Sequence, residues 1–138
     1  MSRIQKLNLS NLVFIDSHFL SKNNIENYEL LRSVDALISD YSSVYYDYLL
    51  CDKPIGLCFD DFEEYNRNEG FTVDPEFILA GGEKIYNTQD LCAFIDRIAA
   101  NEDMLSDTRS QICDLCHMHK DNKSTQRIAD YIMEKIIF

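Results

Sequence analysis

Asp40–Ser43, with the sequence DYSS, is the stretch whose residue types and spacing are best suited to chemistry. It lies between an apolar run, Ala36–Ser39, and a segment with helical spacing, Ser43–Leu50. The first amides of a helix have no backbone partner and carry partial positive charge, so serine hydroxyls beside them could bind a phosphate. The alternative is that Ser42 or Asp40 simply caps the helix, which would stabilise it by about 1 kcal/mol. Both interpretations stay open at this point. No glycine-rich phosphate loop with its lysine is present, which argues against an ATPase.

A second motif combines Cys113, Cys116 and His117 in a CxxCH pattern, and His119 follows closely. The pattern is typical of haem attachment, and its first three residues also fall on one helical face, as in some zinc sites. Covalent haem attachment goes with export, however, and no second pair of zinc ligands accompanies the motif. The favoured interpretation is two buried cysteines and two histidines near a helix C-terminus, where the dipole favours histidine. We therefore expect neither a metal nor a cofactor.

Three weaker candidates complete the set. His18 follows a predicted strand and could act as an acid or base in a cleft, although a lone histidine is more often only a polar surface residue. The acidic pairs Asp60-Asp61 and Glu63-Glu64 could bind a divalent cation, but such runs are more often solvated loop surface. Ser124 is first of all the N-cap of the last predicted helix, and it is also a second possible anion site.

The composition limits the class of protein. The chain has 138 residues, is 46% hydrophobic and carries a net charge of -11, which predicts one acidic globular domain over residues 1–138. An acidic surface repels nucleic acid and anionic lipid, so neither is expected as a partner. Five cysteines form no disulfide framework, and the start lacks the apolar core of a secretory signal. No apolar run approaches the ~20 residues of a membrane span, and we expect a cytoplasmic protein.

The elements that must position these residues follow from the apolar pattern. Long periodic segments in the last third of the chain predict three helices, the first capped by Thr88, the second from Met104 to about Met118, and the third capped by Ser124. An earlier helix is expected over Ile25–Ser33, with Asn23 or Asn24 as its cap. Asp60–Ala80 is expected to be irregular. The short apolar runs predict strands over Leu12–Ile15, Ala36–Ser39 and Pro54–Phe59, with a short fourth over Glu83–Tyr86.

Strands that alternate with helices through short links predict an α/β fold of Rossmann-like type: three layers, with helices covering a parallel sheet. In such sheets ligands bind outside the carboxyl ends of the strands. Three polar segments therefore converge at one rim of the predicted sheet, namely Asp16–His18, Asp40–Ser43 and Asp60-Asp61. This convergence is the main functional clue that the pattern offers by itself.

The sequence DALISDYSSVYYDYLLCDKPIGLCFDDFEEYNRNEGF resembles the C-terminal part of the CDP-glycerol glycerophosphotransferase family, the teichoic acid primases and polymerases with relatives in capsule synthesis. DNKSTQRIADYI resembles the closing helix of the same family. The resemblance covers most of the chain from about Asn11 onward. The residues that carry it are Asp40, Tyr41, Ser42, Ser43, Lys53, Pro54, Asp60, Tyr65, Gly70, Phe71, Asp121, Ser124 and Arg127.

The resemblance implies a GT-B architecture, in which two Rossmann-like halves face each other across a cleft and the C-terminal half holds the nucleotide donor. By that analogy Ser42 and Ser43 would contact the donor phosphates, while Asp40, Tyr41 and Asp60 shape the pocket. The donor would be CDP-glycerol or a related nucleotide-activated polyol phosphate, and the acceptor a wall or capsule polymer bound by the other half.

The chain also departs from the family pattern. Family enzymes are much longer, with an acceptor-side domain and a His-Pro segment upstream, and Asn122 replaces a glycine before the closing helix. We expect this chain alone to bind nucleotide weakly and to lack catalysis, and the catalytic residues stay unknown. A full-length enzyme would be peripheral to the inner face of the membrane. The alternative function is a non-catalytic α/β module, receiver-like or nucleotide-binding.

Overall fold

The computed structural model describes residues 10–136, and residues 1–9 of the start that was compared with a secretory signal lie outside the described range. The chain divides into two compact units, Met1–Val34 and Asp35–Phe138. The first unit contains helices α1 (Ser17–Asn23) and α2 (Asn27–Ser33). The prediction of one domain over residues 1–138 stays a prediction.

The first unit corrects two expectations. The segment Leu12–Ile15 is not a strand, and its four apolar side chains are exposed. A strand needs a hydrogen-bonded neighbour, which an apolar run by itself does not supply. The segment leads into α1, which the sequence pattern did not predict and which Asp16 caps by accepting from the Phe19 amide at 2.8 Å. Helix α2 begins with a reciprocal capping box between Glu26 and Glu29, and not with Asn23 or Asn24 as its cap.

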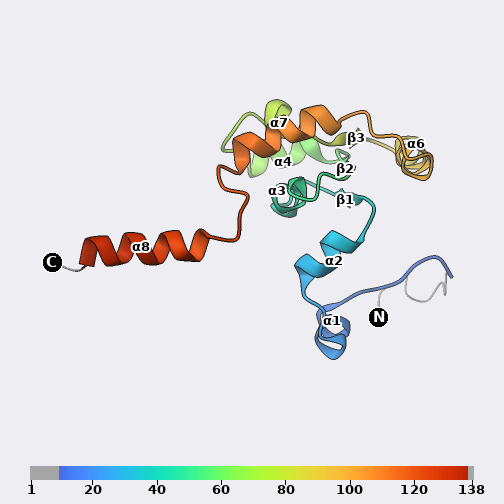
Figure 1. Cartoon of the computed structure of the whole chain (residues 1–138). Helices are drawn as coiled ribbons and strands as arrows, with labels where there is room; N and C mark the ends of the chain where they lie inside the picture. The colour runs from blue at the N-terminus through green and yellow to red at the C-terminus, as the bar shows by residue number, and fades with distance from the viewer. Residues whose placement is uncertain (1–9, 137–138) are drawn as a thin grey trace. The chain divides into compact units, whose positions relative to one another are not determined.

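The second unit is built on a parallel sheet of three strands, β1 (Leu37–Ser39), β2 (Ile55–Cys58) and β3 (Glu83–Ile85), in the order β1-β2-β3 (Figure 1). Leu37 pairs with Ile55, and Gly56 pairs with Glu83. Three of the expected strands are therefore present, each one or two residues shorter than expected. The α/β class and the parallel sheet are confirmed.

Helix α3 (Val44–Leu49) connects β1 to β2 and is the most deeply buried helix of the sheet unit. Its Tyr45 and Tyr48 are fully buried, and the Tyr45 hydroxyl donates to the carbonyl of Ile78 at 2.9 Å. A Cβ at Gly81 would lie 2.8 Å from that hydroxyl and 3.2 Å from the Cα of Arg109, so glycine is needed there for the close approach of α7. Burial raises the pKa of Tyr45 and of Tyr48 to about 12.

The expectation that Asp60–Ala80 is irregular was wrong. The segment forms α4 (Phe62–Asn68) and the single turn α5 (Pro75–Ile78). Pro75 stands at the first helical position, where its fixed φ suits a helix start, and Asp74 accepts from the Glu76 amide at 3.0 Å. Short helices of this kind give little periodicity, so composition alone suggested a loop.

Three helices follow β3: α6 (Thr88–Ala99), α7 (Ser106–Cys116) and α8 (Ser124–Ile136). They confirm the predicted helical last third. Asn87, and not Thr88, caps α6 by accepting from the Asp90 amide at 3.1 Å. Phe94 of α6 is buried, and Ile112 and Cys113 of α7 join it in the core. None of the described helices is long and apolar enough to cross a membrane.

Candidate functional site

The carboxyl ends of β1 and β2 place two polar segments at one edge of the sheet. Asp40–Ser43 follows β1, and Asp60-Asp61 follows β2 after a single buried residue, Phe59. The two segments are in direct contact, because the Tyr41 hydroxyl donates to Oδ1 of Asp61 at 3.0 Å. We call Asp40–Ser43 together with Asp60-Asp61 the rim. The structure therefore brings together two of the three segments that the sequence analysis placed at this edge.

The serines of the rim do not act as helix caps. Ser43 occupies the N-cap position of α3, but no side chain makes a capping hydrogen bond there. The Asp40 carboxylate instead accepts from the Ser42 amide at 2.8 Å, which closes the turn before the helix. Within the described residues, neither the Ser42 nor the Ser43 hydroxyl makes a hydrogen bond, and both residues are exposed. Two hydroxyls therefore remain available to a ligand.

A cluster of aromatic rings packs around Tyr41 of the rim. Tyr41 is at its centre, with ring centroids 5.4 Å from Phe59 and 4.9 Å from Tyr65. Phe62 and Phe71 each lie 5.6 Å from the same ring. Edge-on and tilted contacts of this kind contribute beyond simple burial and fix the orientation of the ring. The long segment after β2 thus serves to hold Tyr41, and with it the backbone of the rim.

The rim carries local negative charge. Burial, the hydrogen bond to Asp61, and the nearby carboxylates of Asp61, Asp60 and Asp40 together hold the pKa of Tyr41 well above its usual range. Burial and the carboxylates of Asp60 and Asp40 likewise raise the pKa of the Cys58 thiol. Tyr41 is therefore a neutral donor near pH 7. A bound anion would have to be held by hydroxyl and amide donors against these carboxylates.

One charged residue near this part of the sheet escaped the sequence analysis. Lys84, in the centre of β3, places its ammonium 5.2 Å from the Phe59 ring centroid and pairs with Glu76. Asp61, which the sequence analysis placed at the rim together with Asp60, accepts the hydrogen bond from Tyr41. No sequence signal marks Lys84, because a single lysine in a short strand is common.

The remaining candidates lie elsewhere. Ser124 begins α8, and its hydroxyl accepts from Arg127 at 3.3 Å, while Arg127 also pairs with Asp121. Its role as a second anion site stays a prediction. His18 is an exposed residue of α1 in the first unit, and its place in a cleft also stays a prediction.

The CxxCH motif is used for packing. Nε2 of His117 lies 2.8 Å from the carbonyl oxygen of Tyr46, so the motif joins α7 to α3. Cys113 is buried, and Cys116 is half-buried. Across residues 10–136 no group of three or more His, Cys, Asp or Glu side chains is placed to hold a metal ion.

A hollow lined in part by Asp35, Pro54 and Asn101 lies at the opposite edge of the sheet, because Asp35 and Pro54 precede β1 and β2. In parallel α/β sheets ligands bind at the carboxyl edge, so the rim is the better candidate site.

The sheet unit is an α/β domain with a parallel sheet, a class in which ligands bind outside the carboxyl ends of the strands. The comparison with known families is more specific. The family described as CDP-Glycerol:Poly(glycerophosphate) glycerophosphotransferase matches residues 9–134, and the chain belongs to this family.

Two curated relatives come from Bacillus spizizenii. A teichoic acid ribitol-phosphate primase is 28% identical over 105 residues, which is 76% of this chain and 26% of the relative. A teichoic acid glycerol-phosphate primase is 52% identical over 53 residues, which is 38% of this chain and 14% of the relative. The chain therefore spans about a quarter or less of the length of these relatives. No solved structure matches the chain.

Proposed function

We propose that this chain is the nucleotide-donor-binding part of a CDP-glycerol:polymer glycerophosphotransferase of teichoic acid or capsule synthesis. The observation that carries the proposal is the pair of exposed Ser42 and Ser43 hydroxyls at the carboxyl edge of the sheet, free of any capping role. The donor would be CDP-glycerol or a related cytidine-activated polyol phosphate. The acceptor polymer would bind to a part of the enzyme beyond this chain, in a GT-B arrangement of two Rossmann-like halves.

In this proposal the rim holds the diphosphate of the donor. The two serine hydroxyls and the amides at the start of α3 would donate to phosphate oxygens whose charge grows as the bond to the transferred phosphorus breaks. The neutral Tyr41 hydroxyl is committed to Asp61, so its role is to fix the backbone of the rim. Asp40 has the same role, because its carboxylate holds the Ser42 amide. Ser124 is proposed as a second anion site that faces the donor only in the complete enzyme.

The test is a titration of the purified chain with CDP-glycerol, CDP and UDP, followed by backbone amide NMR. We expect cytidine-selective shifts at Ser42, Ser43 and their neighbours. Substituting both, Ser42→Ala with Ser43→Ala, should weaken binding at least tenfold, because each lost hydrogen bond to a charged group removes about 1.5 kcal/mol or more. Ser21→Ala, an exposed serine of the first unit, is the matched control.

Indifference of nucleotide binding to the double substitution would contradict the proposal and favour a non-catalytic α/β binding module. A receiver-like module has a further requirement, a lysine free to face the acidic pocket. Lys84 is instead paired with Glu76 and lies over the Phe59 ring, which does not support that alternative. In the full-length enzyme we propose cytoplasmic action at the inner face of the membrane, where a growing wall polymer would be accessible.

A further inference from the structure

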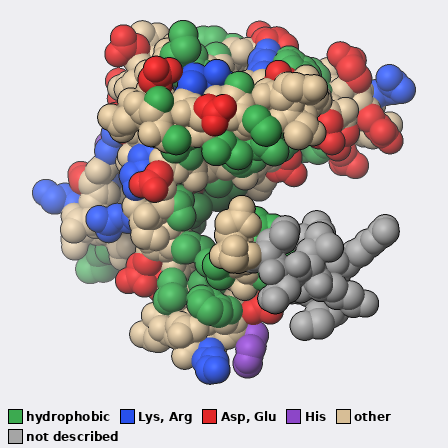
Figure 2. Space-filling view, turned by 90° about the vertical axis from the view of Figure 1, so that its right-hand side faces the viewer, with side chains coloured by type: hydrophobic (Ala, Val, Ile, Leu, Met, Phe, Trp, Pro, Cys, Tyr) green, Lys and Arg blue, Asp and Glu red, His purple; other side chains and the backbone are tan. Residues whose placement is uncertain are grey.

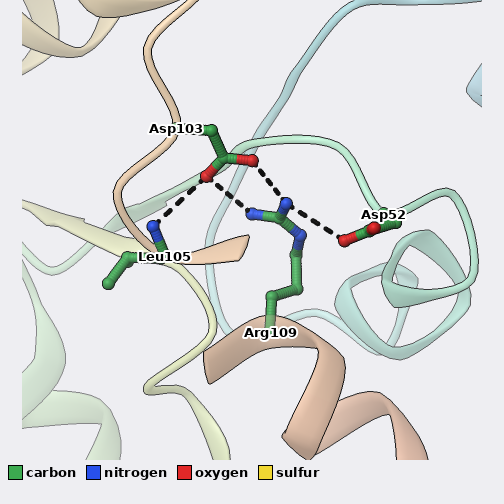
Figure 3. A network of polar contacts seen from close by, with 4 residues as sticks. All are labelled: Asp52, Asp103, Leu105 and Arg109. Atoms are coloured by element: carbon green, nitrogen blue, oxygen red, sulfur yellow. Dashed lines mark hydrogen bonds and ion pairs between the residues drawn. The ribbon is translucent and has the colours of Figure 1, made fainter. Parts of the chain in front are cut away.

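Arg109 is the one buried charged side chain of the described core, with 1% of its surface exposed. Its guanidinium bridges two carboxylates (Figure 3). Nη1 donates to Oδ1 of Asp103 at 3.1 Å, and Nη2 donates to Oδ2 of Asp103 at 2.5 Å and to Oδ1 of Asp52 at 3.2 Å. The Asp103 carboxylate also accepts from the Leu105 amide at 3.2 Å.

These contacts join two structural elements at their ends. Asp52 lies in the tight turn that closes α3, where its amide donates to the carbonyl of Leu49 and its φ is +48°. Asp103 lies in the link that leads into α7. Arg109 therefore ties the C-terminal turn of α3, just before β2 begins, to the first turn of α7.

A gain in stability does not by itself account for the network around Arg109. Nε of Arg109 is buried and has no hydrogen-bond partner among the described residues, which is unfavourable. Buried ion pairs can often be replaced by apolar side chains without loss of stability, because desolvation offsets their attraction. A network that fixes the position of a neighbouring element is a better account of a buried arginine between two aspartates.

Helix α3 is the element that this network would position. It has six residues and is about 9 Å long, so its two ends behave as parts of one rigid body. Its last residues meet Asp52, and its first residue follows Ser43 of the rim. Its middle is fixed by the buried Tyr45 and Tyr48 and by the contact between the Tyr46 carbonyl and His117.

We propose that Arg109 is a positioning residue, which acts through Asp52 and α3 to set the geometry of the Ser42-Ser43 turn. The ligand readout of this proposal rests on the proposed function, whereas its structural readout does not. The proposal implies that a change at Asp52, at the far end of α3, alters the rim in a protein that is still folded.

Asp52→Asn is the primary test, because the Asp52 side chain is 64% exposed and asparagine also adopts a positive φ readily. Arg109→Lys is the second variant, since lysine keeps the charge but loses the fork that spans two carboxylates. Arg97→Gln is the matched control: it breaks an arginine–glutamate pair, to Glu83, in which Arg97 comes from α6 rather than from α3 or α7. Each variant is measured for thermal stability, for amide shifts of residues 40–44 without ligand, and for CDP affinity.

We expect Asp52→Asn and Arg109→Lys to shift the amide signals of Ser42 and Ser43 in the ligand-free protein and to weaken CDP binding roughly three- to tenfold. The control Arg97→Gln should change neither the amide signals nor the affinity for CDP. Unchanged rim amides in folded Asp52→Asn would overturn the proposal. Should the wild-type chain fail to bind any cytidine nucleotide, the proposed function falls, and the ligand-free amide shifts still decide the role of Arg109. Should Arg109→Lys fail to fold, Asp52→Asn decides it.

Discussion

Tyr41 connects the two halves of the rim at the scale of single residues. Its hydroxyl reaches Asp61 across the sheet edge, while its ring packs among Phe59, Phe62 and Tyr65. The tyrosine of the DYSS motif therefore has two separable tasks, a polar one and an apolar one. Substitutions can remove one task and leave the other.

Tyr41→Phe removes the hydrogen bond and keeps the ring. We expect a loss of about 1 kcal/mol in the free energy of unfolding, because the bond joins a hydroxyl to an exposed carboxylate. Tyr41→Leu, which also removes the ring contacts, should cost about 2–3 kcal/mol. Urea denaturation of both variants checks the order. An equal effect of the two substitutions would show that the ring contributes nothing beyond its hydroxyl.

The candidate site was predictable at this scale only where a motif marked it. Asp40, Tyr41, Ser42 and Ser43 are adjacent in sequence, and a strand end on one side with a helix on the other placed them at the rim. Arg109 was not predictable, because its partners Asp52 and Asp103 are brought to it by the fold and no local pattern connects them. The capping alternative for Ser42 failed because the Asp40 carboxylate bonds to the turn before the helix instead.

At the scale of elements, the start of α7 depends on the ionised form of Asp103. Hydrogen bonds and charge from Arg109 hold the pKa of this carboxyl below its usual value. A group with a depressed pKa in the folded state contributes stability that is full above its unfolded pKa, about 3.9, and is lost as the pH falls through the folded value. The contribution is therefore expected at pH 7 and should vanish in strong acid.

Asp103→Asn should lower the free energy of unfolding by about 3 kcal/mol at pH 7, because it leaves a buried arginine with one exposed partner. The difference in the free energy of unfolding between this variant and the wild type should become steadily smaller below pH 4. Denaturant unfolding at pH 7, 5 and 3 measures it. Asp114→Asn is the control, since Asp114 is on α7 itself and pairs with Lys120 at the surface. A gap that stays constant from pH 7 to pH 3 would contradict the assignment.

Elements with strong periodicity were predictable and those without it were not. The helices of the last third carry long apolar stripes, and all three were found. The short helices α1, α4 and α5 have seven residues or fewer and were missed. Helices α2 and α3 are equally short, but each lies in a segment whose spacing of apolar residues predicted a helix. Leu12–Ile15 was wrongly assigned to a strand because its apolar run gave a clear signal. A strand also needs a neighbouring strand with which to form hydrogen bonds, and the apolar run does not supply one.

At the scale of the whole molecule, the net charge of -11 sets the sign of the long-range electrostatic field. Acidic side chains are spread widely over the face drawn in Figure 2. A nucleotide diphosphate is also an anion, so the long-range field of the protein opposes its approach. Short-range donors at the rim must overcome this repulsion.

Salt should therefore not weaken nucleotide binding. Between about 20 and 200 mM NaCl we expect the affinity for CDP to stay level or to rise up to about threefold, because the ions screen the repulsion between like charges. Sites built from lysines and arginines behave in the opposite way. Isothermal titration at several salt concentrations, with sodium chloride replaced by sodium acetate as a control for specific anion competition, measures the slope. A steep loss of affinity would point to a basic site away from the rim.

The parallel pairing of the strands also has a consequence for how the chain folds. Leu37 pairs with Ile55 although the whole of α3 lies between them in the sequence, and Gly56 pairs with Glu83 although α4 and α5 lie between them. Parallel pairing always requires such a crossover connection. The conformational entropy of the crossover is lost before the strands form the contacts that stabilise them. The sheet unit should therefore fold more slowly than a helical bundle of its size, and its refolding rate should depend on how early α3 docks against α7.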